Sequence, residues 1–565
     1  MRLTSLSLRN FKAIGFNEQQ IMFRPITLLL GPNSAGKSTI VQALHYLSEI
    51  LTSNNCNPGT TQLGGKLDLG GFLNLVYLHD PDTTIELAVG LALDNNLLPS
   101  YGAGDEDEHI LLGEILDTEK LLDLSDVETV EVKLGVSWSR QHDRAYVSFY
   151  SVSIDGEHFA TISAKADQKQ IELSILNCQH KIFNEPVNKE EEAINIGEAL
   201  QALVDEFTIQ PKKDNEKPVF VPLQLRSGQW ALPVFNQDLP LAPSNGLLEN
   251  DDIDPNKKLT DKELQQAEDL QTEKAEAELR FILLNRYLSR IIVGAGELAR
   301  DCLQQFLYLG PLREIPGRHF SPERSPGLAR WSSGLGAWDQ LYNEGEDLAK
   351  KINVWLADDK KLNAGYEIRY SEYKPIELDS ALMVALQTGN ELIDSADWLR
   401  EQLNAIPTRQ QLMLRDLRTD IDLYPEDLGT GISQVLPVLV AVLGHNKNIV
   451  AIEQPELHVH PKFQVELGEL FIHAIKHESI ARDTVFILET HSEYMMLRFL
   501  RRLYETANDE LEPGANPLHA EDIGVYYVNP SENGAEIVHL RLTQEGEFLD
   551  RWPNGFFPER KKELF

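Results

Sequence analysis

The stretch GPNSAGKST, from Gly31 to Thr39, fits the phosphate-binding loop pattern G-x-x-x-x-G-K-[ST] and decides the fold class. The apolar run ITLLL (26–30) before it has the length of a buried strand, and TIVQALHYL (39–47) after it has helical spacing. In such a strand–loop–helix unit, backbone N–H groups and the helix N-terminus bind phosphates. We therefore predict an α/β fold with a nucleotide site, in which Lys37 contacts the β and γ phosphates and Ser38 binds Mg²⁺. The predicted phosphate-binding residues are Gly31, Pro32, Asn33, Ser34, Ala35, Gly36, Lys37, Ser38 and Thr39.

Composition limits the kinds of partner and compartment. The chain has 565 residues, enough for two to four domains, and a formal net charge of -36. This charge opposes sequence-independent DNA binding by the whole surface, so nucleic-acid contact is expected to be local or through a partner. Three widely spaced cysteines, without a C-x-x-C pair, fit a reducing compartment. The longest apolar run, Val435–Leu443, is too short to span a bilayer, and the N-terminus does not resemble a signal peptide, so we expect a cytoplasmic protein without membrane contact.

The patterning changes after the first helix. From about residue 83 to 176 apolar and polar residues alternate, with a turn signal at Asp155-Gly156, which predicts an inserted antiparallel β patch. Acidic runs at 105–126 and 190–192 are predicted to be solvated loops. Residues 260–306 contain no proline and have loose helical spacing. They form either one helix of about 70 Å or a helical hairpin.

Two arginine-rich segments have open interpretations. Arg313, Arg318, Arg324 and Arg330 share one Pro/Gly-rich loop, and they either contact nucleotide, DNA or an acidic partner, or form a solvated, partly salt-bridged loop. Arg498, Arg501 and Arg502 share one helical stretch and are predicted to form a solvent-exposed face.

Three further motifs carry nucleotide chemistry. In KNIVAIEQPELHVHP (447–461), a short buried strand ends in Glu453, where a carboxylate can hold Mg²⁺. In FILETHSEY (486–494), His491 follows another apolar strand and can reach a γ-phosphate. In DLGTGISQVLPVLVAVL (427–443), a small-residue turn with Gly429 and Gly431 precedes Ser433 and a buried helix, whose N-terminus can bind an anion.

Together these residues resemble the ABC-type ATPase head of the SMC, RecF and OLD families, over residues 1–80 and from 427 to the C-terminus. The resemblance implies Walker A at 31–38, the signature at 429–434, the Walker B acid at Glu453, the D-loop at 457–461 and the H-loop histidine at His491. The opening L-R-N-F-K looks like the family's first strand, which implies that Lys12 lies close to the nucleotide. The resemblance further implies that the protein binds ATP and Mg²⁺, with Ser38 and Glu453 as ligands of the metal. A homodimer or higher even oligomer is implied too, because such heads sandwich ATP between Walker A of one subunit and the signature of another.

The sequence departs from the family at two places. Where the family usually has Asp then Glu, this chain has Glu453 then Gln454. A glutamine can orient water but cannot take its proton, so we expect slow hydrolysis, or Glu456 as the substitute base. The signature G-T-G-I-S-Q also departs from the L-S-G-G-Q form. His458 and His460 form an H-x-H pair that we interpret as part of the D-loop and not as a metal site.

A more specific resemblance is to the stand-alone ATPases of prokaryotic anti-phage defence. It is carried by I-E-Q-P-E-L-H-x-H-P, S-Q-x-L-P-V-L, G-P-L-R and W-P-x-G-F-F-x-E-R (552–560). This group includes PtuA, the ATPase of Septu and Septu-like retron systems. The resemblance implies a separate HNH nuclease of the PtuB type, with a reverse transcriptase and msDNA as further partners in retron systems. Since OLD ATPases carry their nuclease after the ATPase, and few residues follow His491, we expect no nuclease in this chain.

Four domains are expected. They are an N-terminal ATPase lobe (1–80), a β-rich insertion with acidic loops (81–260), a helical insertion with the Arg-rich loop (261–410) and a C-terminal ATPase lobe (411–565). The expected function is ATP-dependent gating of a nuclease by dimerisation. Two alternatives stay open: a DNA-repair ATPase of RecF type, and an ATP-bound scaffold without hydrolysis.

Overall fold

A computed structural model describes residues 1–57, 69–93, 98, 127–165, 170–183, 196–210, 219–220, 223–225, 230–243, 261–318, 320–388, 396–444, 447–477 and 484–553. The predicted acidic loops at 105–126 and 190–192, and most of the motif at 552–560, lie outside these residues.

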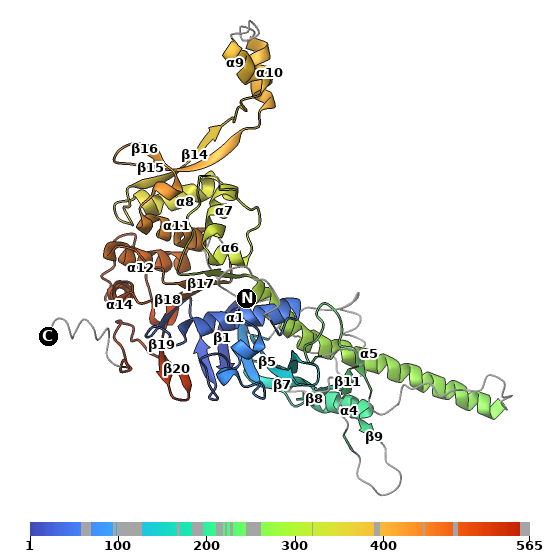
Figure 1. Cartoon of the computed structure of the whole chain (residues 1–565). Coiled ribbons are helices and arrows are strands. Elements are labelled where there is room, and N and C mark those ends of the chain that lie inside the picture. Colours follow the sequence, from blue (N-terminus) through green and yellow to red (C-terminus); the bar gives the residue numbers. More distant parts are fainter. Residues whose placement is uncertain are drawn as a thin grey trace.

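The centre of the fold is a six-stranded sheet of order β13–β17–β18–β3–β19–β20 (Figure 1). Its strands are β13 (Phe306–Leu309), β17 (Ile449–Glu453), β18 (Val485–Glu489), β3 (Ile26–Leu30), β19 (Ile523–Ser531) and β20 (Gly534–His539). All are parallel to their neighbours except β20, which pairs antiparallel with β19. The apolar runs at 26–30, 449–452 and 485–488 are thus central strands, buried on both faces as parallel strands are. Because β3, β17 and β18 point the same way, the residues that follow them meet at one edge of the sheet.

Each face of this sheet packs against a separate hydrophobic core. Leu29, Ala451 and Ile487 lie in the core with α1 (Lys37–Ser53) and α5 (Asp261–Gln304). Their strand neighbours Leu28, Ile452 and Leu488 lie in the core of the opposite face. The helices of that second face are α6 (Leu328–Ser332), α7 (Leu335–Glu344), α8 (Glu346–Ala357), α11 (Thr430–Leu443), α12 (Pro461–Lys476) and α14 (Glu493–Ala507). The alternation of side chains along each strand therefore separates α1 from α11 by the thickness of the sheet.

A nine-stranded antiparallel sheet has the order β12–β11–β8–β7–β6–β5–β4–β1–β2. Its strands are β1 (Arg2–Arg9), β2 (Gln19–Met22), β4 (Ile85–Ala92), β5 (Thr129–Ser139), β6 (Arg144–Ile154), β7 (Glu157–Ala164), β8 (Ile171–Leu176), β11 (Leu223–Leu225) and β12 (Leu241–Ala242). The predicted antiparallel β patch is confirmed, and its turn signal at Asp155 and Gly156, both with positive φ, lies between β6 and β7. The β patch is continuous with the first two strands of the chain.

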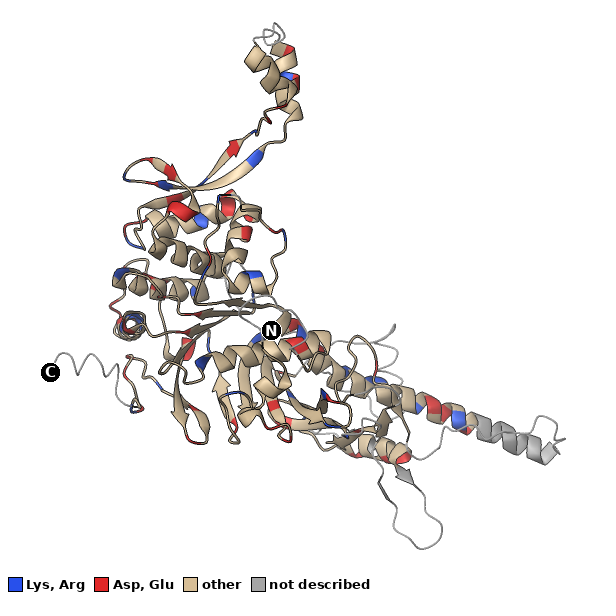
Figure 2. Cartoon of the chain, in the orientation of Figure 1, with Lys and Arg blue, Asp and Glu red and all other residues tan. Residues whose placement is uncertain are grey.

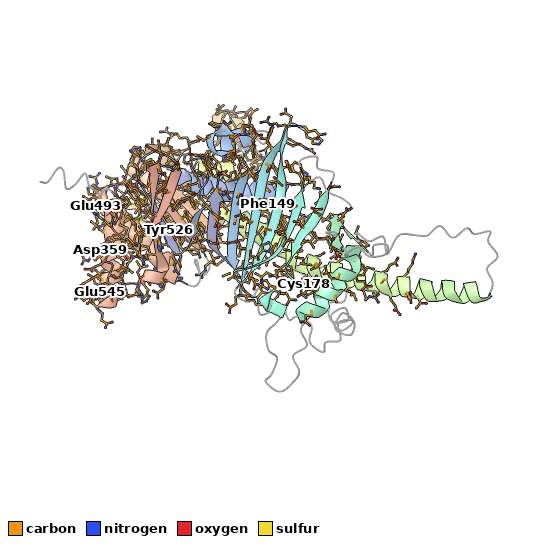
Figure 3. All side chains as sticks on the ribbon, turned by 90° about the horizontal axis from the view of Figure 1, so that it is seen from below. Phe149, Cys178, Asp359, Glu493, Tyr526 and Glu545 are labelled. Atoms are coloured by element: carbon orange, nitrogen blue, oxygen red, sulfur yellow. The ribbon has the colours of Figure 1, made fainter. Side chains whose placement is uncertain are left out.

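The two sheets are tied together near the start of the chain. The hydroxyl of Tyr526, on β19, donates a hydrogen bond of 2.7 Å to the carbonyl of Met22, on β2. Figure 3 places Tyr526 on the parallel sheet and Phe149 on the antiparallel one. Both sheets share the core that contains α1 and α5, so the P-loop helix is fixed between them. The remaining short elements on this side are α2 (Phe72–Leu75), α4 (Ile196–Thr208), β9 (Ile209–Gln210) and β10 (Val219–Phe220).

Residues 261–304 form one continuous helix, α5, of 44 residues and about 66 Å. Of the two alternatives for this segment, the single helix is correct and the hairpin is wrong. Its inner half is buried, and the Tyr150 hydroxyl donates to the carbonyl of Ile292 at 2.6 Å. Acidic and basic side chains alternate along the described outer part, for example Glu278 and Arg280 (Figure 2). Amphipathic packing inside and charge outside keep the helix unbroken.

A short helical pair occurs elsewhere in the predicted helical region. The three-stranded sheet of β14 (Tyr366–Tyr373), β15 (Arg409–Asp416) and β16 (Ile421–Leu423) packs on α8, and α9 (Ala381–Thr388) and α10 (Ala396–Ala405) follow at the far end of the β14–β15 ribbon (Figure 1). The hairpin-like unit is therefore formed by residues 381–405. Among the described helices, none is long and apolar enough to cross a membrane.

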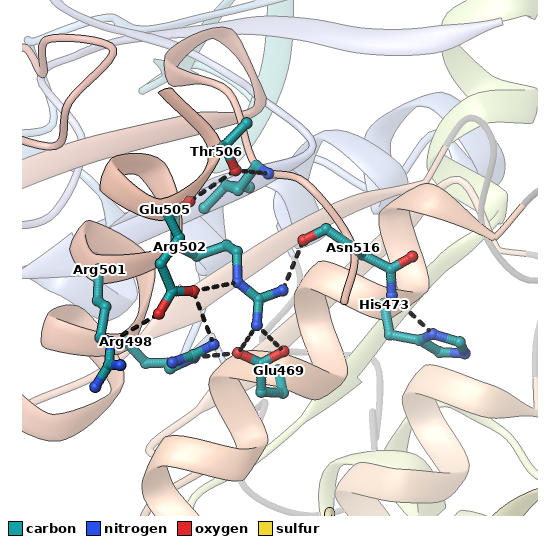
Figure 4. A network of polar contacts seen from close by, with 9 residues as sticks. Glu469, His473, Arg498, Arg501, Arg502, Glu505, Thr506 and Asn516 are labelled. Carbon is teal, nitrogen blue, oxygen red and sulfur yellow. Dashed lines mark hydrogen bonds and ion pairs between the residues drawn. The ribbon is translucent and has the colours of Figure 1, made fainter. Parts of the chain in front are cut away.

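The predicted solvent face of α14 is wrong for two of its three arginines. Arg502 is buried, and Nη2 donates to both oxygens of Glu469 on α12, at 2.7 and 2.8 Å (Figure 4). Its Nε donates to Glu505 at 3.1 Å and its Nη1 to the carbonyl of Asn516 at 2.6 Å. Arg498 also pairs with Glu469 and Glu505. Only Arg501 is largely exposed, at 71% of its side chain.

We expect Arg502→Met to lower the free energy of unfolding by about 3 kcal/mol. The substitution keeps most of the packing volume but leaves buried acceptors without their donors, a loss that typically costs about 3–5 kcal/mol. Arg498 still faces both carboxylates, so the lower end is expected. The matched control is Arg501→Met, which should change stability by less than about 0.5 kcal/mol. Urea unfolding of both variants measures the difference, and equal stabilities would contradict the structural role of Arg502.

Candidate nucleotide-binding site

The P-loop joins the end of β3 to the start of α1, as predicted. Gly31 and Gly36 adopt φ angles of 139° and 102°, which are strained for any residue with a side chain. A Cβ at Gly31 would lie 2.4 Å from the carbonyl oxygen of Val528, and one at Gly36 would lie 2.7 Å from Cβ of Ala13. Both glycines are thus required by the tight packing of the loop. The loop leads into the N-terminus of a 17-residue helix, where no side chain caps the first turn and backbone N–H groups can bind an anion.

Lys37 is buried and folded back on its own loop. Its Nζ donates to the carbonyls of Gly31, at 3.2 Å, and Pro32, at 2.9 Å. The same ammonium lies 3.7 Å from Oε1 of Glu489. Burial lowers the pKa of Lys37, and the negative charge of Glu489 opposes that shift. The ammonium is therefore held against the carbonyls of Gly31 and Pro32, and a bound phosphate can replace them as its hydrogen-bond acceptor.

The predicted metal ligands Ser38 and Glu453 lie close to each other. Oε1 of Glu453, at the end of β17, accepts a hydrogen bond of 2.9 Å from the hydroxyl of Tyr308. Burial raises the pKa of Glu453 to about 7, and the neighbouring Glu489 adds to this rise, while the hydrogen bond from Tyr308 and the nearby Ser38 hydroxyl oppose it. Hydroxyl and carboxylate oxygens are the hard ligands that Mg²⁺ prefers. The donor set of Ser38 and Glu453 therefore fits this ion.

Glu456 contacts the H-loop. Its Oε1 accepts a hydrogen bond of 2.7 Å from the backbone N–H of His491, and its Oε2 accepts one of 2.9 Å from the hydroxyl of Thr490. Burial raises the pKa of Glu456, whereas burial and the charge of Lys37 lower the pKa of His491. The structure therefore brings Glu456 and His491 together beside the P-loop. Gln454 has a φ of 43°, and its N–H donates to the carbonyl of Glu489 at 2.7 Å.

The signature residues lie on the other face of the sheet. Gly429 caps α11, and the buried Ser433 hydroxyl donates to the carbonyl of Gly429 at 3.3 Å. A Cβ at Gly431 would lie 3.3 Å from the carbonyl of His458, so the signature turn packs against the D-loop. Since α1 and α11 belong to different cores, the structure does not bring Gly429, Gly431 and Ser433 to the P-loop of the same chain.

Arg313 connects the signature helix with the Walker B strand. Its Nη1 donates to the carbonyl of Gln434 at 3.3 Å, and its Nη2 donates to the carbonyls of Glu453, at 2.7 Å, and Gln454, at 3.2 Å. Gln434 in return donates from Nε2 to the carbonyl of Arg313 at 2.7 Å. Burial lowers the pKa of Arg313 to about 10, although it stays charged at neutral pH. This arginine is internal, so it neither contacts a partner nor belongs to a solvated loop.

Two of the other loop arginines, Arg318 and Arg330, follow the salt-bridged alternative, and Arg324 is exposed. Arg318 pairs with Glu426 and Asp427, at 2.5 and 3.2 Å, and Arg330 pairs with the buried Asp339. The H-x-H pair agrees with the D-loop interpretation, because Nδ1 of His460 accepts from the N–H of Lys462 and caps α12. No group of three or more His, Cys, Asp or Glu that could hold a metal occurs in the part of the chain that the structure describes.

Lys12 lies in the turn that packs against the P-loop through its neighbour Ala13. It occupies a tight turn with φ of 49°, and the next residue, Ala13, packs against Gly36. Burial lowers the pKa of Lys12.

Two residues of the site were missed by the sequence reasoning. Glu489 contacts both Lys37 and Ser38, and Tyr308 contacts Glu453. The signal for Glu489 was available, because it ends an apolar strand in the same way as Glu453 does. Tyr308 gave no such signal, since its partner lies 145 residues away in the sequence.

Comparison with known protein families supports an ATPase. A family model described as "AAA domain, putative AbiEii toxin, Type IV TA system" matches residues 316–496, and one described as "AAA domain" matches residues 5–62. These two segments contain the P-loop and the predicted signature, Walker B, D-loop and H-loop. Together with the strand order, they confirm the predicted fold class: an α/β, ABC-type P-loop ATPase head with an antiparallel β part and a helical part. No curated protein matches the chain.

The chain is also similar to solved structures of SMC head domains. A head with an extended coiled coil from Pyrococcus furiosus, bound to the C-terminal domain of ScpA, is 11% identical with a TM-score of 0.37, covering 96% of each chain. The head from Thermotoga maritima is 10% identical with a TM-score of 0.34, covering 96% of this chain and 100% of that one. The head from Pyrococcus yayanosii is 11% identical with a TM-score of 0.36, covering 96% of this chain and 98% of that one.

Proposed function

We propose that this chain is an SMC-like ATPase subunit of a prokaryotic anti-phage defence complex, which binds ATP, hydrolyses it slowly and gates a separate nuclease. The observation that carries the ATPase part is the convergence of Lys37 and Ser38 with the carboxylate-bearing ends of two neighbouring strands. The defence part is supported by the motif resemblance and by a family description that names a toxin–antitoxin system.

Different residues of the site bind the phosphates, hold the metal and orient the attacking water. Backbone N–H groups of the P-loop, Lys37 and Lys12 bind the phosphates, and Ser38 and Glu453 hold Mg²⁺. When bound, Mg²⁺ neutralises charge that develops on the phosphoryl oxygens. His491 contacts the γ-phosphate from the H-loop, where Glu456 holds its backbone. Gln454 orients the attacking water without removing its proton, which makes hydrolysis slow.

The proposed active unit is a homodimer or a higher even oligomer. The signature turn and the P-loop of one chain lie on opposite faces of the central sheet, so one chain cannot place both on the same nucleotide. A second copy can supply the signature across an interface. Binding of the γ-phosphate then closes the dimer, and hydrolysis opens it.

Slow turnover distinguishes this proposal from a scaffold that never hydrolyses ATP. We expect purified protein to release phosphate from Mg²⁺–ATP slowly, with specific activity rising with protein concentration because two chains form each site. Gln454→Glu should be at least as active, since it adds a carboxylate where the family has its base. A Lys37→Ala preparation gives the background. Wild-type phosphate release no higher than this background would favour the scaffold.

The proposed partner is a nuclease-bearing protein of HNH type, and its contact surface is the region between Thr83 and Arg330, which departs from a bare ATPase head. In a retron-type system a reverse transcriptase and msDNA would join the complex. We expect the purified chain alone to cut neither DNA nor RNA in Mg²⁺. Nuclease assays on plasmid and RNA substrates measure this. Robust Mg²⁺-dependent cleavage by this chain alone would contradict the assignment of the nuclease to a partner.

The RecF-type alternative predicts direct DNA binding. The net charge of -36 argues against it, because a whole-surface contact with phosphates would be repulsive. A titration of DNA across a range of salt concentrations tests this alternative.

A further inference from the structure

Glu489 stands at the same edge of the sheet as the Walker B acid. It is the last residue of β18, and it is in register with Glu453, the last residue of the neighbouring parallel strand β17. Residues in register on parallel neighbours lie about 4.8 Å apart along the sheet. The sheet therefore presents two carboxylates, and not one, beside the start of the P-loop.

The side chain of Glu489 contacts both reactive residues of the P-loop. Its Oε2 accepts a hydrogen bond of 2.8 Å from the hydroxyl of Ser38, and its Oε1 lies 3.7 Å from the ammonium of Lys37. The glutamate is 7% exposed and Lys37 is 4% exposed, so solvent screens these contacts little. Ser38 is the P-loop hydroxyl that binds Mg²⁺ in the proposed function, and Glu489 accepts its hydrogen bond.

Carboxylates outnumber cations in this cluster. Three carboxylates, Glu453, Glu456 and Glu489, act on the ammonium of Lys37, and two of them also act on the guanidinium of Arg313. A nucleotide adds further negative charge to the same place. A divalent cation held by carboxylate oxygens offsets such an excess, and Mg²⁺ takes hard oxygen ligands of this kind.

We propose that Glu489 is a second acidic residue that holds Mg²⁺ in the nucleotide site, together with Ser38 and Glu453. The inference rests on the proposed function and deepens it, because it assigns a role to a residue outside the Walker motifs. The metal is then held from two neighbouring strands, β17 and β18, and from the P-loop.

A structural role predicts a different result from the same substitutions. If Glu489 only accepts a hydrogen bond from Ser38, a neutral acceptor of the same shape serves equally well. If it holds Mg²⁺, removing its charge weakens the metal contribution to nucleotide binding. Binding without metal does not weaken, since Lys37 is released from its ion pair and one repulsive charge is removed.

The test is calorimetric titration of a non-hydrolysable ATP analogue, with Mg²⁺ and with EDTA. We expect Glu489→Gln to reduce the Mg²⁺-dependent gain in affinity at least about tenfold, as Glu453→Gln should also do, without weakening binding in EDTA. Glu489→Thr, a smaller neutral residue that suits a strand, is the second variant in case the first does not fold. Glu493→Gln, which removes a carboxylate four residues further on, is the matched control and should keep the wild-type gain. Thermal unfolding identifies folded variants.

The outcomes separate this inference from the proposed function. The inference would be overturned if Glu489→Gln and Glu489→Thr kept the wild-type Mg²⁺-dependent gain in affinity for the analogue. It would also be overturned if both variants lost affinity equally with Mg²⁺ and with EDTA. In both cases wild-type protein still binds the analogue and the proposed function stands. If wild-type protein does not bind the analogue at all, the proposed function itself fails.

Discussion

Glu456→Gln is expected to stop ATP turnover while ATP still binds. General-base catalysis is typically worth about 10²–10⁴-fold, and Gln454 supplies no carboxylate at the usual position. Glu456 is the next acid in the same loop, and burial raises its pKa toward the range in which a carboxylate accepts a proton. Steady-state phosphate release and equilibrium binding of ATP, measured on the same preparation, check both halves of the prediction.

The contacts of Glu456 define how this result is interpreted. One oxygen of Glu456 accepts a hydrogen bond from the hydroxyl of Thr490, and the other accepts one from the N–H of His491. A glutamine has only one side-chain oxygen, so its NH₂ group would face one of these two donors and that hydrogen bond would be lost. A pure positioning role lowers turnover at every pH. A base role also removes the acid limb of the pH–rate profile. Glu466→Gln, which removes a half-buried carboxylate from α12, is the matched control. Full activity in Glu456→Gln would reject both roles.

Lys37→Ala is expected to weaken ATP binding by at least about tenfold and to abolish turnover. A charge-assisted hydrogen bond contributes about 1.5–3 kcal/mol, and about 1.4 kcal/mol corresponds to a factor of ten in affinity. The substitution also leaves Glu489 without its ammonium partner, so the site repels the phosphates more strongly. Isothermal titration with ATP measures the loss.

The control for Lys37→Ala is Lys350→Ala. Lys350 lies on α8, with 69% of its side chain exposed, and its pairs with Glu346 and Asp347 are surface contacts of little energetic weight. It should bind ATP as the wild type does. If Lys37→Ala bound ATP with wild-type affinity, the P-loop assignment would be contradicted.

Much of the site was readable from short stretches of sequence. The loop 31–39, the strand that ends at Glu453, the strand that precedes His491, and the glycine turn before α11 were all found from local pattern. The reason is that loop chemistry and strand or helix periodicity depend on residues a few positions apart. The division into two sheets was only partly readable. The alternation at 83–176 indicated antiparallel strands, but nothing local shows that β1 and β2 join them.

Three features depended on contacts between distant parts of the chain. The alternatives for 260–306 were decided by the packing of α5 on both sheets, which supports one long helix. The face of α14 that carries Arg502 looks polar in sequence, yet Glu469 on α12 makes it a buried network. Likewise, Arg313 is internal because Gln434 and the end of β17 meet it there.

The sequence by itself determined that this protein has a P-loop ATPase head and where the predicted nucleotide-binding motifs lie in the chain. The tertiary structure decided which carboxylates face the P-loop, because strand order is set by pairing across the whole chain: Ser38 and Glu489 are 451 residues apart and only 2.8 Å from each other. It also decided that the signature and the P-loop lie on opposite faces. Side chains alternate across a strand, so the face on which each helix packs follows from the assembled sheet and from no single motif.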